Sequence, residues 1–152
     1  MSRRNSRRRA SGPLHARDTP RHLRLQIRCA ADVVALLPHL KEAEQEYFYV
    51  LGLDSRHRVL MTHCAAIGMV DHDQVTLRDM FHEAVRNNCA AIVCTHNHPS
   101  GDPAPSGADH ELTHHLLQAA WLLGIPLLDH VVIGRSSVYS YAEAGRLLFS
   151  GE

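Results

Sequence analysis

The sequence AAIVCTHNHPSGDPAPSGADHELT, residues 90–113, has the most informative pattern in the chain. Residues 90–95 form a short continuous apolar run, which predicts a buried strand. Residues 97–107 are rich in Pro, Gly, Ser and Asp and predict a loop. Ser106 then begins a predicted helix. Because loops at the ends of buried strands are held by a rigid scaffold, this loop is a suitable place for a functional site.

Two helices and two strands are predicted before this stretch. Residues 30–40 predict a short helix that Pro38 stops or bends. Residues 46–54 and 58–67 are rich in aromatic and β-branched side chains and predict a hairpin with a polar turn. Helical spacing over about residues 76–87 predicts a further helix, with the apolar residues Leu77, Met80, Phe81, Ala84 and Val85.

The elements after the loop complete a mixed sheet. The helix that begins at Ser106 ends at Gly124 and Pro126, because Gly followed by Pro is typical of a helix terminus. Its apolar face carries Leu112, Leu116, Ala119 and Leu123. Residues 127–133 and 137–141 predict two more strands. The sum is an α/β (α+β) domain with a mixed β-sheet flanked by helices.

The composition favours one globular domain, since the chain has 152 residues of which 45% are hydrophobic. No apolar run approaches the roughly 20 residues that a membrane helix needs. No apolar segment follows the arginines near the start, so a secretory signal is not expected. The four cysteines form no C-x-x-C pair, and we expect Cys89 and Cys94 to be buried, reduced thiols of a cytoplasmic protein.

The net charge of zero hides a strong asymmetry. Residues 1–28 contain nine Arg and one acid, whereas the rest of the chain has seven basic and fifteen acidic residues. A basic segment with few apolar residues predicts a disordered, Arg-rich arm over residues 1–25, followed by a folded domain over residues 26–152. Arginines in residues 1–28 could bind the phosphates of a nucleic acid. A solvated tail with no partner explains them at least as well.

His96, His98 and Asp109 are the candidate metal ligands. Side chains two residues apart on an extended backbone point the same way, so the two imidazoles can converge. Asp109 follows at the start of the predicted helix and can supply an oxygen. Two histidines and one carboxylate leave the fourth position of a tetrahedral zinc open to water, which is typical of catalytic zinc. Zn²⁺ is therefore the expected cofactor.

A second interpretation of the same residues remains open. Ser106 and Asp109 also match a helix capping box, in which a Ser and an acid three residues later bond to each other's backbone amides. The two histidines could be ordinary polar loop residues, because the chain has 13 histidines and close pairs will occur by chance.

The joint pattern is far more restrictive. His-x-His, seven residues, Ser, two residues and Asp form the JAMM motif of the MPN metallopeptidases, and residues 96–109 match it. Four segments resemble those of the bacterial RadC family in the same order. They are VLGLDSRHRV at 50–59, HNHPSGDPAPSGAD within residues 96–109, LLDHVVIG at 127–134 and YSYAEAGRL at 139–147. The resemblance covers about residues 30–148.

The resemblance implies an MPN/JAMM-like (cytidine-deaminase-like) architecture and a zinc-dependent hydrolase of peptide or isopeptide bonds. JAMM proteins carry a glutamate on an earlier strand as general acid/base for the zinc-activated water, and the matching residue is Glu46. Ser106 matches the serine that stabilises the oxyanion. Without the resemblance Glu46 would be an exposed strand-end residue, and Glu42 and Glu44 would compete for the role.

Two features depart from the family. RadC proteins usually carry an upstream region that resembles helix-hairpin-helix DNA-binding modules, where this chain has its Arg-rich arm. Residues 71–78 lack the His-Pro pair of many relatives. The first departure weakens a DNA-repair role. The alternative function, motivated by the Arg-rich arm, is a nucleic-acid-associated accessory protein in DNA repair or mobile-element biology. A scaffold with an inactive site is a third, which the complete ligand set argues against.

Several polar residues lie outside the motif. We expect Asp129 and His130, which interrupt an apolar strand, to be a satisfied buried pair or strand-end polar groups. The alternative is that one of them orients a metal ligand. His110, His114 and His115 are expected on the solvated face of the helix, although the i, i+4 pair His110–His114 could bind a metal adventitiously.

Overall fold

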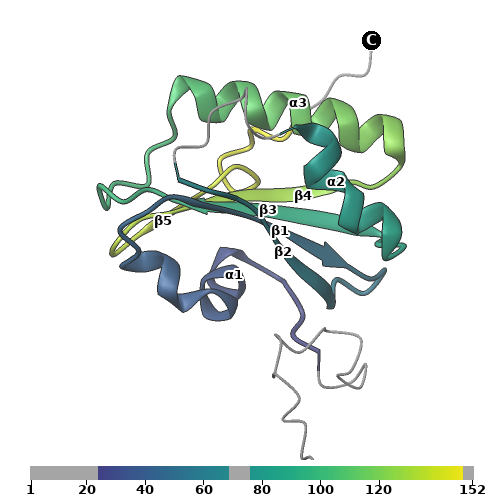
Figure 1. Cartoon of the computed structure of the whole chain (residues 1–152), viewed down its shortest axis with the longest axis horizontal. Helices are drawn as coiled ribbons and strands as arrows, with labels where there is room; N and C mark the ends of the chain where they lie inside the picture. Colours follow the sequence, from purple (N-terminus) through teal and green to yellow (C-terminus); the bar gives the residue numbers. More distant parts are fainter. Residues whose placement is uncertain (1–23, 69–75, 149–152) are drawn as a thin grey trace, which may run out of the picture.

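The computed structural model describes residues 24–68 and 76–148 of the chain (Figure 1). Nearly all of the Arg-rich arm predicted over residues 1–25, and most of the segment 71–78, lie outside the described residues. The disorder of the arm and the start of the folded domain therefore stay predictions.

The helices and strands of the described residues follow the order that the sequence predicts. The elements are α1 (Ala30–Leu36), the 3₁₀ helix η3 (Pro38–Lys41), β1 (Tyr47–Leu53), β2 (Val59–Ile67), α2 (Leu77–Arg86), β3 (Ala91–Asn97), α3 (Gly107–Leu123), β4 (Leu127–Ile133) and β5 (Val138–Ser140). The predicted mixed α+β fold is confirmed.

The strands form one sheet in the order β2-β1-β3-β4-β5. β1 pairs antiparallel with β2 and with β3, whereas β3 pairs parallel with β4, and β4 pairs antiparallel with β5. The parallel connection needs a long crossover, which α3 provides. β3 pairs with a strand on each side and is buried at every residue, so it holds the start of the following loop in a fixed position.

Helices cover both faces of the sheet (Figure 1), with α2 and α3 on one face and α1 on the other. Each strand contributes alternate residues to the two faces. The core under α2 and α3 includes Phe48, Val50, Met80, Phe81, Ala84, Ile92, Leu112 and Leu116. The core under α1 includes Ile27, Val33, Leu40, Leu51, Leu53, Val93, Val131 and Ile133.

The predicted helix over residues 30–40 is two short helices. Leu37 leaves the α conformation with φ −126° and ψ 57°, and Pro38 follows it. Proline has no amide hydrogen and cannot continue the bonding pattern of α1, so the chain restarts as η3. The predicted effect of Pro38 is confirmed: the helix stops before it, and residues 38–41 form a separate 3₁₀ helix.

Two further details of the prediction need correction. β3 continues to Asn97, so His96 and Asn97 lie in the strand and not in the loop after it. Val85 and Leu123, expected on apolar helix faces, are 51% and 50% exposed. The buried positions of α2 and α3 end before them, at Ala84 and Ala120.

Among the described residues no helix has both the length and the apolar character needed to cross a bilayer. The four cysteines all lie in the described residues and form no disulfide. Cys89 and Cys94 are buried as expected, whereas Cys29 is exposed and Cys64 is half-buried.

Candidate metal centre

Four side chains converge where β3 ends, and one ligand atom from each lies within 4.8 Å of the others: Glu46, His96, His98 and Asp109. The Nε2 atoms of the two histidines are 3.1 Å apart. Asp109 bridges them, with Oδ1 3.1 Å from His96 Nε2 and Oδ2 3.1 Å from His98 Nε2. Glu46 Oε1 lies 3.9 Å from His96 Nε2. In residues 24–68 and 76–148 this is the one group of three or more His, Cys, Asp or Glu side chains compact enough to hold a metal ion.

The end of β3 brings the two histidines together. His96 lies in the strand opposite Phe48 of β1. His98 follows the strand, and its amide still donates to the carbonyl of Ile133 in β4 at 3.0 Å. The backbone therefore stays extended between the histidines, and both rings leave on the same side. The side chain of His96 is 1% exposed and that of His98 18%, so the pair lies at the boundary between core and solvent.

Asn97 holds the backbone on both sides of Glu46. Its Oδ1 accepts a hydrogen bond from the Tyr47 amide at 2.8 Å, and its Nδ2 donates to the Gln45 carbonyl at 2.9 Å. These bonds fix the two peptide groups that flank Glu46. The spacing of the motif gives Asn97 no role beyond separating the two histidines, so this contact is not predicted from it. A polar amide that directly continues an apolar strand was the available signal.

Asp109 serves the helix and the site at once. Ser106 Oγ accepts from the Asp109 amide at 3.1 Å, and Asp109 Oδ2 accepts from the Ser106 amide at 2.8 Å, so the capping box is present. The same carboxylate faces both histidines. The capping interpretation is therefore confirmed, and it is compatible with the metal-ligand interpretation, because a carboxylate can accept several hydrogen bonds.

The pKa values follow from these contacts. Burial alone would raise the pKa of Asp109, but hydrogen bonds with His96 and His98 and with the Ser106 amide hold it well below its usual range. Asp109 is therefore ionised at neutral pH. The hydrogen bond to Asp109 raises the pKa of His98, against the effect of burial. The negative charge of Asp109 makes the space between the rings attractive to a cation.

The outer nitrogen of each ring decides which atom can bind a metal. His98 Nδ1 lies 2.8 Å from the Asp102 carbonyl, which can only accept. Nδ1 therefore carries the hydrogen, and a neutral His98 presents a bare Nε2 to the group. His96 Nδ1 lies 2.9 Å from His130 Nε2, so its Nε2 is also the atom that faces the group. Two imidazole nitrogens beside carboxylate oxygens are a donor set that fits a metal ion.

Ser106 touches the group through Asp109. Its hydroxyl oxygen accepts from the Asp109 amide, which leaves the hydroxyl hydrogen free of the cap itself. The side chain belongs to an exposed residue at the start of α3. The cap and a contact to a substrate oxyanion would use different parts of the hydroxyl, and the second of these stays a prediction.

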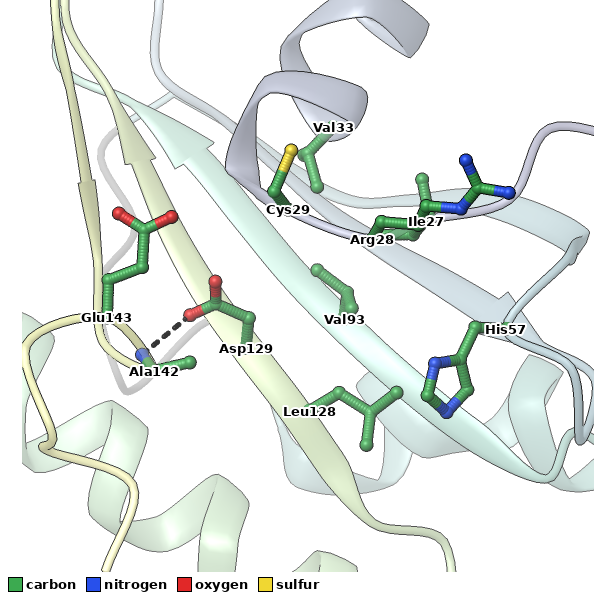
Figure 2. A pocket seen from close by; sticks show the side chains of 10 residues that line it. All are labelled: Ile27, Arg28, Cys29, Val33, His57, Val93, Leu128, Asp129, Ala142 and Glu143. Atoms are coloured by element: carbon green, nitrogen blue, oxygen red, sulfur yellow. Dashed lines mark hydrogen bonds between the residues drawn. The ribbon is translucent and has the colours of Figure 1, made fainter.

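Asp129 and His130 do not form a pair, because consecutive residues of β4 point to opposite faces of the sheet. His130 is fully buried and lies against His96, which agrees with the alternative that it orients a ligand. Asp129 lies on the α1 face, where it accepts from Ser140 Oγ at 2.6 Å and from the Ala142 amide at 3.0 Å. Figure 2 shows it beside a hollow under α1. Burial raises the pKa of Asp129 and lowers that of His130.

The histidines of α3 divide into two kinds. His114 and His115 are exposed, as expected. His110 is half-buried, with Nδ1 2.9 Å from the Tyr141 hydroxyl and Nε2 3.5 Å from Arg146 Nη1. The expectation of a solvated position is wrong for His110, because the segment after β5 folds over the first turns of α3.

A mixed sheet with helices on both faces, a His-x-His at the end of its central strand and an Asp at the start of the next helix defines a JAB/MPN-type domain. The profile of the family described as "RadC-like JAB domain" matches residues 27–146. The chain belongs to the RadC family.

The curated relatives that it resembles are named UPF0758 proteins. That of Halalkalibacterium halodurans is 42% identical over 128 residues, which are 84% of this chain and 55% of the relative. The Trichlorobacter lovleyi protein is 42% identical over 108 residues, 71% of this chain and 47% of the relative. The Listeria welshimeri protein is 40% identical over 120 residues, 78% of this chain and 54% of the relative. The chain thus spans about half the length of these relatives.

Proposed function

We propose that this chain is a zinc-dependent hydrolase of peptide or isopeptide bonds, with His96, His98 and Asp109 as the metal ligands. The observation that supports it is the meeting of two Nε2 atoms and both Asp109 oxygens, with separations of 3.1 Å. Two imidazoles and one carboxylate are typical ligands of catalytic zinc, whereas Mg²⁺ and Ca²⁺ prefer oxygen ligands alone. Membership of a family with a JAB-type domain agrees with a hydrolase.

Glu46 is the proposed general acid/base. Bound zinc would polarise the scissile carbonyl and lower the pKa of a water molecule. The Glu46 carboxylate reaches within 3.9 Å of His96 Nε2, and its side chain is 21% exposed, so it borders both the group and solvent. It accepts a proton from the attacking water as the new C–O bond forms. It then gives that proton to the nitrogen as the C–N bond breaks, and the amine leaves neutral.

Ser106 is the proposed stabiliser of the oxyanion. Its hydroxyl hydrogen would donate to the carbonyl oxygen as negative charge develops there. A donor that is already oriented is worth about 3–4 kcal/mol in such a position. The bond from the Asp109 amide to the Ser106 hydroxyl restricts the side chain and supplies that orientation.

Metal analysis of the purified full chain tests the ligand set. We expect about one zinc per chain in the wild type and none in His96→Ala and Asp109→Ala. His82→Ala is the matched control, because His82 has a 63% exposed side chain on α2 and lies outside the group. Asp109→Asn separates the two functions of that residue, since an amide oxygen can still accept from the Ser106 amide but is a poor zinc ligand. Unchanged zinc in the His96 and Asp109 variants would remove the proposal.

Hydrolysis tests the role of Glu46. Glu46→Gln should retain zinc and lose hydrolysis of a panel of fluorogenic peptides and isopeptide-linked dipeptides, because an amide cannot carry the proton. Glu44→Gln is the control, since Glu44 is an exposed neighbour that competed for the role in the sequence. Loss of hydrolysis in the Glu44 variant alone would reassign the acid/base.

A second proposal concerns the arm. The nine arginines of residues 1–28 favour binding to nucleic acid through phosphate contacts. A salt titration of DNA binding by the full chain and by a chain that lacks residues 1–25 tests it. Equal affinity and equal salt dependence of the two proteins would discard the role of the arm.

A further inference from the structure

A line of hydrogen bonds runs from the back of His96 into the core. His96 Nδ1 lies 2.9 Å from His130 Nε2. His130 Nδ1 lies 2.6 Å from Thr113 Oγ1, and Thr113 Oγ1 lies 2.7 Å from the carbonyl oxygen of Asp109, one turn earlier in α3. All three side chains are at most 2% exposed. The line thus begins at the Asp109 backbone and ends at the ring that faces the Asp109 carboxylate.

The Asp109 carbonyl fixes the direction of every bond in the line. A carbonyl oxygen can only accept, so the single hydrogen of the Thr113 hydroxyl points to it. Thr113 Oγ1 must then accept from His130, which places the hydrogen of that ring on Nδ1. A neutral His130 accepts at Nε2, so His96 donates from Nδ1. In the neutral ring the remaining nitrogen of His96, Nε2, then has its lone pair toward the group, and Nε2 donates to Asp109 Oδ1, 3.1 Å away, only when the ring is protonated.

Ring packing holds the two imidazoles in these positions. Tyr141 stacks on His130 with ring centroids 5.2 Å apart and planes 10° apart. Phe48 stacks on His96 with centroids 5.9 Å apart and planes 13° apart, and meets His130 edge-on at 5.6 Å. Neither ring can swing out to solvent without disrupting the core under α3.

We propose that Thr113 and His130 are positioning residues that lock His96 in the Nδ1–H tautomer and so present its Nε2 to the metal. This inference rests on the proposed metal site. It goes beyond it because neither residue touches the metal position: each acts through its neighbour. Partners of this kind commonly affect metal affinity by about 10–100-fold.

Removal of the Thr113 hydroxyl should reverse the donor and acceptor roles of His130 and His96 in this line of hydrogen bonds. In Thr113→Val, a side chain of the same shape, His130 Nδ1 loses its acceptor. The favourable arrangement then places the hydrogen of His130 on Nε2, where it donates to His96 Nδ1. His96 must carry its own hydrogen on Nε2, and the metal position is blocked. Thr113→Ser keeps the hydroxyl and should keep the original direction.

Long-range ¹H–¹⁵N correlation spectra of the zinc-free full chain, recorded at about pH 8, above the ordinary histidine pKa of about 6.5, report the tautomer of each ring. We expect Nδ1–H for His96 and His130 in the wild type and in Thr113→Ser, and Nε2–H for both in Thr113→Val. Nε2–H tautomers in the wild type would overturn the proposal, even if the valine variant fails to fold.

Zinc titration against a chelator of known affinity supplies the second readout. We expect Thr113→Val to lower zinc affinity about 10–100-fold and Thr113→Ser to lie within about threefold of the wild type. A purely structural role would lower the Tm of the valine variant and leave both its tautomers and its zinc affinity unchanged, which would overturn the proposal. Absence of hydrolysis would count against the proposed function and not against the positioning role of Thr113 and His130, because neither the tautomer nor the zinc affinity is measured through activity.

Discussion

The two faces of the central strands use buried polar residues in different ways. On the α1 face, Thr95 and Asn97 bond to backbone: Thr95 Oγ1 donates to the Val131 carbonyl at 2.8 Å, and Asn97 joins the two peptides that flank Glu46. On the α3 face, the alternate residues of β3 and β4 bond to other side chains. The polar residues on the α1 face therefore stabilise the backbone of the sheet, whereas those on the α3 face orient imidazole nitrogens toward the candidate metal centre.

Acidic residues show the same contrast. Asp129 lines the hollow under α1 together with Glu143 and Arg28 (Figure 2), but its two oxygens accept from the Ser140 hydroxyl at the end of β5 and from the Ala142 amide after it. Its carboxylate therefore stabilises a turn. Asp109 on the α3 face also accepts from its own helix, yet both of its oxygens remain within 3.1 Å of an imidazole.

The largest expected effect is the increase in the free energy of unfolding when zinc binds, because the proposed metal site lies on the α3 face only. Zinc at a thousandfold excess over its Kd should add about 4 kcal/mol to the free energy of unfolding, because it binds the folded chain only. The increase should be absent in His98→Ala and unchanged in His82→Ala. Thermal unfolding with and without zinc measures it, and an equal Tm in both conditions would contradict a metal site.

A pair of core substitutions should separate the faces. Leu51→Ala, in the core under α1, should cost about 3 kcal/mol of stability through the cavity it leaves and should not change zinc affinity. Phe48→Leu should cost only about 1 kcal/mol but should weaken zinc binding, because Phe48 stacks on His96. Urea unfolding and zinc titration of both variants measure the two effects. Equal losses of zinc affinity would erase the distinction between the faces.

Asn97→Asp tests whether a residue on the α1 face can still control the site. The buried carboxylate loses the bond to the Gln45 carbonyl and should cost about 1–3 kcal/mol. Zinc content should stay the same, whereas hydrolysis should fall about 100-fold, because the backbone of Glu46 loses one of its two anchors. Loss of zinc together with activity would show that Asn97 serves the histidines instead.

The smallest effect is expected at the turn between β1 and β2, which contains none of the buried polar residues compared above. Asp54 accepts from the amides of Arg56 and Arg58 and from Arg58 Nε at 2.8–2.9 Å. Burial would raise the pKa of Asp54, but these bonds together lower it. The contribution of the carboxylate is therefore fully present above the ordinary Asp pKa of about 4 and is lost as the pH falls through the lower folded value.

Asp54→Asn should accordingly cost about 1 kcal/mol at neutral pH, and the difference from the wild type should shrink in acid. Urea unfolding of the zinc-free proteins at about pH 7 and about pH 3 gives both values. A difference that grows on acidification would contradict this account.

Sequence patterns predicted the sheet well because strand periodicity and turn residues are local signals. The bounds of β1, β2, α2 and β4 agree with prediction within about one residue, since the apolar residues that define them are also the ones that are buried. α1 was predicted too long because the pattern continues past Leu37, although the backbone bonds of the helix end there. The last turn of α3 was assigned to the core because spacing alone does not show where the sheet beneath it ends.

The site was predictable in part. The JAMM spacing predicted that His96, His98 and Asp109 lie together, as they do, and only the family resemblance added Glu46 to them, because no local pattern links a strand start to a distant loop. The role of His130 was left open, since the partner that defines it, Thr113, lies on another element. The contacts of Asn97 depend on the register of β1 against β3, which no sequence pattern contains.

The bonds from Asn97 to residues 45 and 47 span 52 and 50 positions of the chain. Closing so long a loop is slow and entropically costly, and it must precede any assembly of Glu46 beside the histidines. A fragment that ends before β3, or one that begins after β1, cannot form this arrangement. Loading with zinc should therefore be a late event in folding, unlike the metal-driven collapse of a zinc finger.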